Sequence, residues 1–290
     1  MAKFIITGGT GLIGTQLCKK LLTAQHDVYL LTTQKAVKHP LSGIEYVYWN
    51  PAENYIDPAF KLHDCVIINL AGAGVSEKRW TDKRKQEIVS SRINSLHTLY
   101  HAVKTGQFTC QQLLSASAIG YYGNTMKKLS ESDAPDNSFL SQTCVQWEAA
   151  TRPFLELGIA VHIVRIGIVL SSEGAALREL TKPLQWGIAA IPGDGRQIMS
   201  WIHIDDLCCM MLFLLESKKE GIYNGTADYP VSANRLFDEI EKYKKGMRVH
   251  IPGWILKVVL GEMHDEVMKS ADVSNSRIRE AGFTFRYPDI

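Results

Sequence analysis

The chain has 290 residues, of which 46% are hydrophobic and 21% charged, and its formal net charge is +2. These values are typical of a globular protein with a core large enough to fold without disulfide bridges, as one large domain with an appendage or as two domains. The near-neutral charge balance excludes the strong positive field expected of a protein that binds nucleic acid or anionic membranes.

The six cysteines form no CxxC pair and no zinc-type spacing, and most lie in apolar runs. We therefore expect buried, reduced thiols and no metal site. A glycine motif begins at Thr7, which leaves no room for a signal peptide ahead of it. No window approaches the run of about 18 apolar residues that a membrane span requires. These features predict a cytoplasmic protein without a membrane partner.

The first element in chain order is a short apolar strand, 4–6, which leads through a glycine turn into an amphipathic helix, 15–22. The turn carries Gly9-x-Gly11-x-x-Gly14, and the strand–turn–helix context gives this spacing its meaning. One glycine permits the tight turn, the next lets a pyrophosphate approach the backbone, and the last lets helix and strand pack closely. The helix N-terminus then attracts the phosphates. A plain glycine turn is the alternative, but the context favours a dinucleotide site.

Strand and helix patterns alternate through the first half of the chain. Amphipathic runs predict helices over 81–104 and 141–157. Apolar or alternating runs predict further strands at 28–31, 45–49, 65–71, 112–117 and 160–165. This alternation predicts right-handed βαβ units and an α/β fold with a Rossmann-type doubly wound parallel sheet, whose ligands bind beyond the carboxyl ends of the strands.

The pattern loosens after Arg165. A very apolar helix is predicted over 205–216, and further helical or turn-rich segments at 174–187, 191–196, 233–243, 254–260 and 274–281. We expect residues 1–165 to form the dinucleotide-binding domain, with later segments completing its sheet. Residues 166–290 are then a smaller, mostly helical substrate lobe.

The residues after the second strand bear on which dinucleotide binds. An acidic side chain at this position bonds the ribose 2′-hydroxyl in NAD sites. This chain has Thr32 and Thr33 there, followed by Lys35 and Lys38, while Asp27 lies at the opposite end of the strand. Hydroxyl and ammonium groups suit a 2′-phosphate. The pattern favours NADP(H) over NAD(H), and the alternative is a solvated basic turn.

Small and hydroxyl-bearing residues follow the next two strand ends. Residues 70–72 end the fourth strand and allow a cofactor to lie against the backbone. Ser117, Tyr121 and Tyr122 end or follow the fifth strand. A serine there orients a substrate and a tyrosine donates a proton, although core packing is an equal alternative for the tyrosines.

The most specific runs in the chain are Lys78-Arg79-Trp80-Thr81 and Trp201-Ile202-His203-Ile204-Asp205-Asp206. With these runs the chain resembles the extended branch of the short-chain dehydrogenase/reductase superfamily, and more closely the YfcH-like epimerase family. The part from about residue 249 resembles the short domain of unassigned role that closes these chains. The resemblance covers essentially the whole chain, and its other matching stretches are 7–14, 69–72, 90–92, 115–123, 147–148, 165–170, 195–197, 260–262 and 281–283.

The resemblance implies hydride transfer at a nicotinamide. In the superfamily a tyrosine is the general acid/base, a lysine four residues later lowers its pKa, and a serine orients the substrate. Ser117 matches the serine, but Leu140 and Cys144 stand where the tyrosine and lysine belong. Neither side chain does those jobs, so the usual mechanism is in doubt while cofactor binding is not. Tyr121 or Tyr122 is left as the proton donor.

Four arginines suggest an anionic substrate, because guanidinium groups bind phosphate or carboxylate oxygens bidentately. Arg79 and Arg92 flank the helix after the fourth strand, and Arg165 ends the sixth strand. Arg196 lies in the loop where related epimerases hold a nucleotide-sugar diphosphate. For any single arginine, a surface or interdomain ion pair is the alternative.

These patterns together assign residues to three roles. Catalysis is assigned to Ser117, Tyr121 and Tyr122, and substrate binding to Arg79, Arg196 and His203. For the neighbouring Asp205 we favour helix capping and interdomain hydrogen bonding over acid/base chemistry. The predicted cofactor site comprises Gly8, Thr10, Gly11, Leu12, Ile13, Gly14, Thr32, Thr33, Lys35, Leu70, Ala71, Gly72, Arg92, Ser115, Cys144 and Arg165.

The leading hypothesis is an NADP(H)-binding, atypical short-chain reductase or epimerase that acts on a small anionic substrate such as a nucleotide sugar. The second hypothesis is a sensor or scaffold that holds NADPH without hydride transfer, which the missing tyrosine–lysine pair favours. By analogy with relatives, we expect a homodimer formed through helices 81–104 and 141–157.

Overall fold

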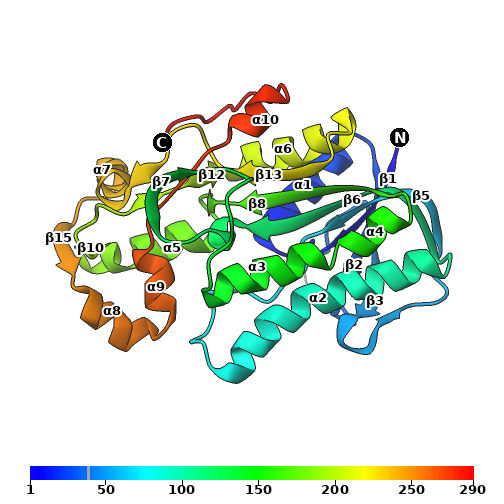
Figure 1. The fold of residues 1–290 in the computed structure, drawn as a ribbon, viewed down its shortest axis with the longest axis horizontal. Coiled ribbons are helices and arrows are strands. Elements are labelled where there is room, and N and C mark those ends of the chain that lie inside the picture. Colours follow the sequence, from blue (N-terminus) through cyan, green and yellow to red (C-terminus); the bar gives the residue numbers. More distant parts are fainter. Residues whose placement is uncertain (38–39) are drawn as a thin grey trace.

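The computed structural model describes residues 1–37 and 40–290, and its main body is a sheet with helices on both faces (Figure 1). The strands of this sheet are β1 (Lys3–Thr7), β2 (Asp27–Thr32), β3 (Ile44–Asn50), β4 (Tyr55–Ile56), β5 (Leu62–Asn69), β6 (Phe108–Ala118), β8 (Ala160–Ile166) and β13 (Gly221–Gly225). The described residues form it in the order β13-β8-β6-β5-β1-β2-β3-β4, and β4 alone runs antiparallel to its neighbour. The predicted doubly wound parallel sheet is confirmed.

Two layers of helices enclose this sheet (Figure 1). One face packs against α1 (Leu12–Thr23), α6 (Ile204–Ser217) and α10 (Ser276–Glu280), and the other against α2 (Asp82–Lys104), α3 (Phe139–Ala149) and α4 (Arg152–Glu156). Successive side chains of β1 point to opposite faces of the sheet. Phe4 and Ile6 pack in the core beneath α1, α6 and α10, and Ile5 packs in the core beneath α2, α3 and α4. Burial on both faces explains why the strands are continuously apolar in sequence.

Helix α6 and strand β13 return to the main body late in the chain. Asp205 of α6 accepts a hydrogen bond from Gln16 at 2.8 Å and pairs with Lys20 of α1 at 3.1 Å. The predicted capping role belongs to a neighbour instead, because the ring of His203 accepts from the Asp205 N–H at 3.2 Å and caps α6. Asp205 therefore ties α6 to α1 within the main body through a hydrogen bond and an ion pair.

The smaller lobe lies beyond the carboxyl ends of the sheet strands (Figure 1). Its helices are α5 (Ala175–Thr181), α7 (Ala233–Tyr243), α8 (Gly253–Leu260) and α9 (Met263–Met268). Short strands that the sequence patterns missed join them: β9 (Ile168–Leu170) with β12 (Trp201–His203), β10 (Ile188–Pro192) with β15 (Met247–Ile251), and β14 (Val231–Ser232), β11 (Ile198–Met199), β16 (Ala271–Val273) and β7 (Thr125–Leu129) in a four-stranded sheet. These strands have two to five residues each, too few for a hydrophobic period to be visible.

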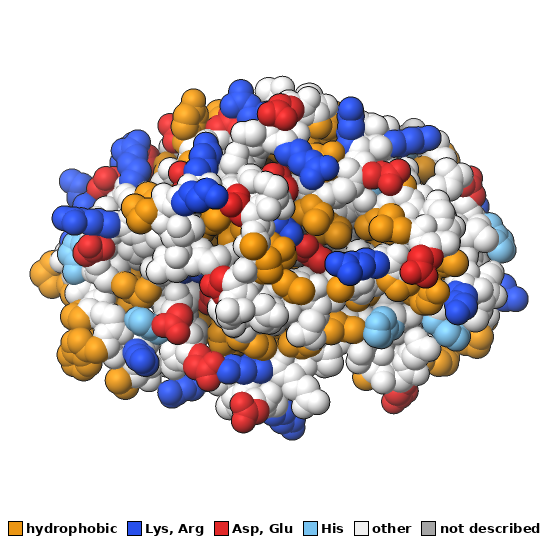
Figure 2. Space-filling view, viewed as in Figure 1, with side chains coloured by type: hydrophobic (Ala, Val, Ile, Leu, Met, Phe, Trp, Pro, Cys, Tyr) orange, Lys and Arg blue, Asp and Glu red, His pale blue; other side chains and the backbone are white. Residues whose placement is uncertain are grey.

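The surface carries a mixture of charges. Acidic and basic side chains are interspersed across the face shown in Figure 2, in keeping with the net charge of +2. The six cysteines are free thiols, and Cys110 and Cys209 are the two that are not buried. No helix in the described part of the chain combines the length and the apolar character needed to cross a membrane.

Candidate functional site

The glycine turn joins β1 to α1 and lies against the loop that follows β5. Gly8 has a φ of +67°, and a Cβ atom on it would lie 2.5 Å from the carbonyl oxygen of Leu70. A Cβ atom on Gly14 would lie 2.4 Å from the carbonyl oxygen of Gly8. Gly8, rather than Gly9, is therefore the residue that the tight turn requires, and Gly14 lets α1 pack onto the turn.

The start of α1 is open. Gly11 is the N-cap residue, and within the described residues no side chain caps the first N–H groups of the helix. A Cβ atom on Gly11 would have one described non-neighbouring atom within 4 Å, the carbonyl oxygen of Gly8 at 3.3 Å. Neither the backbone conformation at position 11, with a φ of −79°, nor its surroundings in the fold thus require glycine there. Open space beside uncapped N–H groups is the arrangement that binds a phosphate or diphosphate.

A groove of about 410 Å³ extends from this turn across the carboxyl ends of β2, β3 and β5. This is the edge at which doubly wound sheets bind their ligands. The groove is lined by the turn, by the ends of the three strands and by one side of α2: Gly8, Thr10, Leu31, Thr32, Thr33, Gln34, Trp49, Asn50, Pro51, Ala52, Ala71, Gly72, Glu87, Ser90, Ser91 and Asn94.

The groove is lined at the end of β2 by the hydroxyl-bearing residues Thr32 and Thr33, and no acidic residue lies among the described residues at this strand end. Thr32 accepts a hydrogen bond from the Gln34 N–H at 3.2 Å, and Thr33 is exposed beside it. Lys35 is also exposed, next to the lining residue Gln34. Lys38 lies outside the described residues. The described end of β2 therefore presents hydroxyl groups to the groove.

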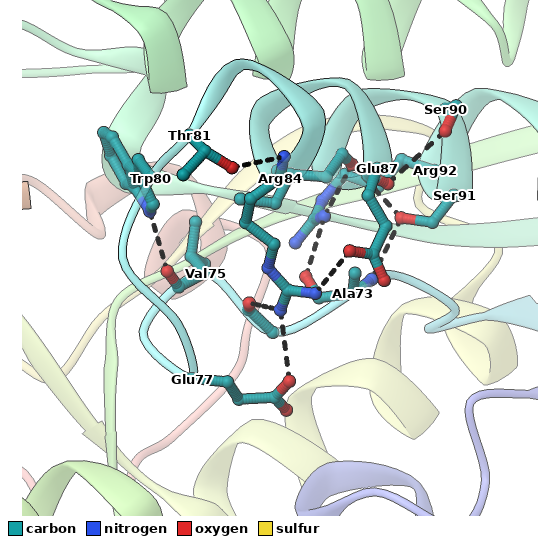
Figure 3. A network of polar contacts seen from close by, with 12 residues as sticks. Ala73, Val75, Glu77, Trp80, Thr81, Arg84, Glu87, Ser90, Ser91 and Arg92 are labelled. Atoms are coloured by element: carbon teal, nitrogen blue, oxygen red, sulfur yellow. Dashed lines mark hydrogen bonds and ion pairs between the residues drawn. The ribbon is translucent and has the colours of Figure 1, made fainter.

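A network of polar contacts fixes the loop between β5 and α2 (Figure 3). The buried guanidinium of Arg84 donates to Glu87 at 2.8 Å and to Glu77 at 3.1 Å. Arg92 donates to the carbonyl oxygen of Ala73 at 3.0 Å, and burial lowers its pKa. Because a Cβ atom on Gly72 would lie 3.0 Å from the Arg92 guanidinium carbon, Arg92 stands directly behind the wall of the groove. The network therefore fixes the loop 70–81, which lines the groove with its first residues and a second cavity with its later ones.

That second cavity, also of about 410 Å³, lies between the carboxyl end of β6 and the lobe. Most of its walls are apolar, and one of them is Leu140, which the sequence resemblance aligns with the superfamily's tyrosine. Its apolar lining residues include Val75, Trp80, Ile119, Leu140, Ile168, Ala176, Leu180, Ile198, Met199, Met263 and Val267.

Two ionisable side chains from the end of the chain enter this apolar cavity. The side chain of Lys269 is 10% exposed, and its ammonium lies 3.4 Å from Glu266 and 3.5 Å from the carbonyl oxygen of Gly120. Burial raises the pKa of Glu266. Sequence reasoning missed both residues, because a short helical segment without a motif carries them. Only their tertiary position reveals them.

A polar hollow of about 780 Å³ opens on the other side of the glycine turn, and Thr10 lines both it and the groove. Gly11, Leu12 and His203 also line it. The ring of His203 lies 4.0 Å from that of Tyr287. The structure thus places His203 near the start of α1, beside the glycine turn.

A buried polar cluster gathers three of the residues that the sequence assigned to the site. Ser117 donates to Glu148 at 2.7 Å, and Arg165 binds the same carboxylate through two hydrogen bonds of 2.8 and 2.9 Å. Arg165 also donates to the Tyr122 hydroxyl at 2.9 Å, which donates to Asn224 at 2.8 Å. Ser117, Tyr122 and Arg165 are each no more than 2% exposed. Burial raises the pKa of Tyr122 to about 12.

This cluster contains two of the three residues predicted to be catalytic, Ser117 and Tyr122. The hydroxyl groups of Ser117 and Tyr122 are enclosed and bound to protein atoms. Tyr121 stacks on the Arg165 guanidinium, whose carbon lies 3.4 Å from the ring centroid, and borders a different hollow beside α3 and α4. Arg165 donates its hydrogen bonds to Glu148 and Tyr122. The hydrogen bonds of the cluster join α3 to β6, β8 and β13.

Other residues predicted to bind the cofactor lie behind the groove. Ser115 is buried and donates to the carbonyl oxygen of Ala116 at 3.2 Å. The Cys144 thiol, whose pKa burial raises to about 11, lies 3.7 Å from the carbonyl oxygen of Ala118. Ile13 and Leu70 pack against the core, so their side chains support the turn rather than line the groove.

The two arginines predicted to bind substrate lie at the surface. Arg196 is 86% exposed, and its charge partner is Asp194 of the same loop, at 3.7 Å. Arg79 is exposed beside Gly261. Neither residue lines the apolar cavity as described, so the structure does not bring the predicted anion ligands together.

Comparisons with known proteins agree with this geometry. A family model described as "NAD dependent epimerase/dehydratase family" matches residues 4–225, and one described as "Domain of unknown function (DUF1731)" matches residues 251–290. The chain is similar to Epimerase family protein SAR0825 of Staphylococcus aureus (strain MRSA252). The two are 33% identical over 294 residues, which cover 100% of this chain and 97% of that protein.

Two solved structures share the fold. Human epimerase family protein SDR39U1 (isoform 2), solved with NADPH, matches with a TM-score of 0.84 and 24% identity over 99% of this chain and 96% of that one. UDP-glucuronic acid 4-epimerase of Bacillus cereus, solved with UDP-glucuronic acid and NAD, matches with a TM-score of 0.75 and 19% identity over 96% and 92%.

Proposed function

Because the chain belongs to the NAD dependent epimerase/dehydratase family, we propose that it binds NADP(H) in the groove and acts as an oxidoreductase or epimerase on a small molecule in the adjoining apolar cavity. The observation that carries this proposal is the open start of α1, where Gly11 leaves space beside uncapped N–H groups. The turn would hold the diphosphate of the cofactor, and the bound nicotinamide would supply hydride chemistry.

The preference for NADP(H) rests on the end of β2. Thr32 and Thr33 line the groove there, and Lys35 is exposed one residue beyond the lining. Charge-assisted hydrogen bonds from such groups stabilise a 2′-phosphate, whereas a carboxylate at this position would repel it. The related human protein was solved with NADPH, which supports the same choice.

The variant Thr33→Asp tests this preference. A carboxylate at position 33 repels the 2′-phosphate and can accept from the ribose 2′-hydroxyl of NADH. We expect the Kd for NADPH to rise about tenfold or more, since hydrogen bonds to charged groups contribute about 1.5–3 kcal/mol, and the Kd for NADH to fall. Calorimetric titration with each cofactor measures both constants.

Thr284→Asp is the matched control, because it adds the same charge at an exposed threonine outside the groove. It should leave both dissociation constants unchanged. Equal NADPH affinities in the wild type and in Thr33→Asp would place the ribose away from the end of β2 and contradict the assignment.

Turnover is tested separately from binding. The purified protein is mixed with NADPH, and its absorbance is followed against a panel of ketones, aldehydes, quinones and sugar nucleotides. Oxidation of NADPH by one class supports an oxidoreductase and identifies its substrate. For an epimerase, the sugar nucleotides are incubated with NADP⁺ instead, which accepts a hydride from the substrate and returns it to the opposite face, and are analysed for inverted product without net formation of NADPH.

A second function is favoured by one observation. Leu140 and Cys144 replace the superfamily's tyrosine and lysine, and Ser117 and Tyr122 are enclosed in the buried cluster. A protein that holds NADPH as a sensor or scaffold needs none of these groups. Tight NADPH binding with neither oxidation nor epimerisation across the whole panel would favour this function.

A further inference from the structure

The apolar cavity receives its basic group from the end of the chain. Among the described residues that line it, Lys269 is the one with a basic side chain. Lys269 follows α9 directly, and Glu266 lies within that helix. Both fall in the segment 251–290, which matches the domain of unknown function. This segment therefore completes a cavity whose other walls come from the dinucleotide-binding part and the rest of the lobe.

The side chain of Lys269 is largely enclosed, but its ammonium is weakly bound. Its side chain is 10% exposed, and its two hydrogen-bond acceptors lie at 3.4 Å and 3.5 Å, at the long limit for such bonds. An ammonium has three donors, and removing it from water is costly unless they are used. Lys269 therefore retains the capacity to donate to a further oxygen inside the cavity.

The position of this ammonium relates it to the missing tyrosine. Gly120, whose carbonyl oxygen lies 3.5 Å from the Lys269 ammonium, is in the turn directly after β6. A Cβ atom on Gly120 would lie 3.5 Å from the Cβ atom of Leu140, which stands at the tyrosine's position. Lys269 thus extends from the lobe toward Leu140. At this position the superfamily has a tyrosine hydroxyl group, and this chain has none.

The walls of the cavity indicate the class of compound that fits. Residues such as Trp80, Ile168 and Val267 make it mostly apolar, and among the described lining residues no arginine is present. A nucleotide sugar brings two phosphates, which guanidinium groups hold best. Glu266 also balances the charge of Lys269, which disfavours a second anion but not a neutral acceptor such as a carbonyl oxygen.

We propose that this cavity binds a small, mostly apolar carbonyl compound, and that the Lys269 ammonium, positioned by Glu266, donates a hydrogen bond to its carbonyl oxygen. The proposal rests on the proposed function, because it names the substrate class of that same site. A cation so placed polarises the carbonyl group. The C-terminal segment then supplies the polar contact that the superfamily takes from its tyrosine.

Calorimetry on the NADP⁺-saturated protein tests the proposal with acetophenone, cyclohexanone and 2-heptanone. Wild type is compared with Lys269→Met, which keeps an unbranched side chain but removes the donor. Lys245→Met is the matched control, because Lys245 is exposed and outside the cavity. At least one ketone should bind the wild type and Lys245→Met equally, and Lys269→Met about tenfold more weakly, as expected for a lost hydrogen bond to a charged group.

Infrared spectroscopy of the same ketone, labelled with ¹³C at the carbonyl, provides a readout that requires no variant to fold. Donation from an ammonium lowers the carbonyl stretching frequency. The bound ketone should absorb at a lower wavenumber in the wild type than in an apolar solvent. In Lys269→Met the frequency should return toward the apolar value.

The outcomes separate this proposal from the proposed function. Failure of NADP⁺ to bind the wild type would contradict the proposed function itself. If NADP⁺ binds but none of the three ketones does, or if UDP-glucose binds instead, the substrate class is wrong. Wild-type ketone affinity in Lys269→Met, or an unshifted carbonyl frequency in the wild type, would overturn the role of Lys269.

Discussion

Replacing Gly11 by valine is expected to weaken NADPH binding by at least about 100-fold while the protein stays folded. A Cβ atom at this position would have one described atom within 4 Å, the carbonyl oxygen of Gly8 at 3.3 Å, so a side chain there requires a shift of only a few tenths of an ångström. The space that the valine fills is the space that a diphosphate needs against the N–H groups of α1. A 100-fold loss corresponds to about 2.8 kcal/mol of binding free energy. Calorimetric titration measures it.

Gly253→Val is the matched control for this variant. Gly253 is the first residue of α8, and a Cβ atom there would lie 3.2 Å from the His264 ring, a similar crowding outside the groove. The control should bind NADPH like the wild type. Tight NADPH binding by Gly11→Val, with an unchanged unfolding midpoint, would show that the diphosphate lies elsewhere.

The largest expected effect on stability comes from Arg165→Met. This change leaves the Glu148 carboxylate, which is 11% exposed, without the cation that binds it bidentately. Breaking a buried ion pair by removing one partner costs about 3–5 kcal/mol, a large part of the about 5–15 kcal/mol by which proteins are stable. Urea unfolding, followed by far-UV circular dichroism, measures the loss.

The double variant Arg165→Met/Glu148→Gln separates the lost contact from the stranded charge. A neutral amide at position 148 removes the unpaired carboxylate, so the double variant should recover part of the stability. If Arg165→Met instead unfolds like the wild type but no longer binds NADPH, Arg165 would belong to the ligand site, as the sequence alone suggested.

The sequence was most informative about the sheet. The apolar run 4–6, the glycine turn and the helix predicted over 15–22 agree with the start of the fold, where α1 begins three residues earlier, at Leu12. The resemblance to an epimerase family is also confirmed, by the match over residues 4–225. Strand β13 has no predicted counterpart, since its five residues carry a single strongly apolar side chain beside glycines.

The polar site was harder to predict, because position along a strand does not determine which face a side chain occupies. Ser117 and Arg165 were correctly placed at strand ends, but neighbouring strand residues point to opposite faces. Their register pairing puts them opposite each other in β6 and β8, and both reach Glu148. The sequence does not distinguish a hydroxyl group that is hydrogen-bonded to a carboxylate of the protein from one that is free to bind a substrate.

The position of Lys269 in the apolar cavity depends on tertiary contacts, which the sequence does not show. Lys269 is separated from Gly120 by 149 residues, and no periodicity or spacing relates the two. The same limit applies to assembly and location. The homodimer through helices 81–104 and 141–157, the two-domain division at residue 165 and the cytoplasmic location stay predictions.

Calorimetric titration of the wild-type protein with NADPH tests most directly whether a nicotinamide dinucleotide binds where α1 begins. We predict saturable binding to one site per chain, tighter for NADPH than for NADH. The unfolding free energy should rise by about 2.7 kcal/mol when free NADPH reaches 100 times its Kd. Absence of both binding heat and stabilisation at about 1 mM NADPH would contradict a dinucleotide site at the start of α1.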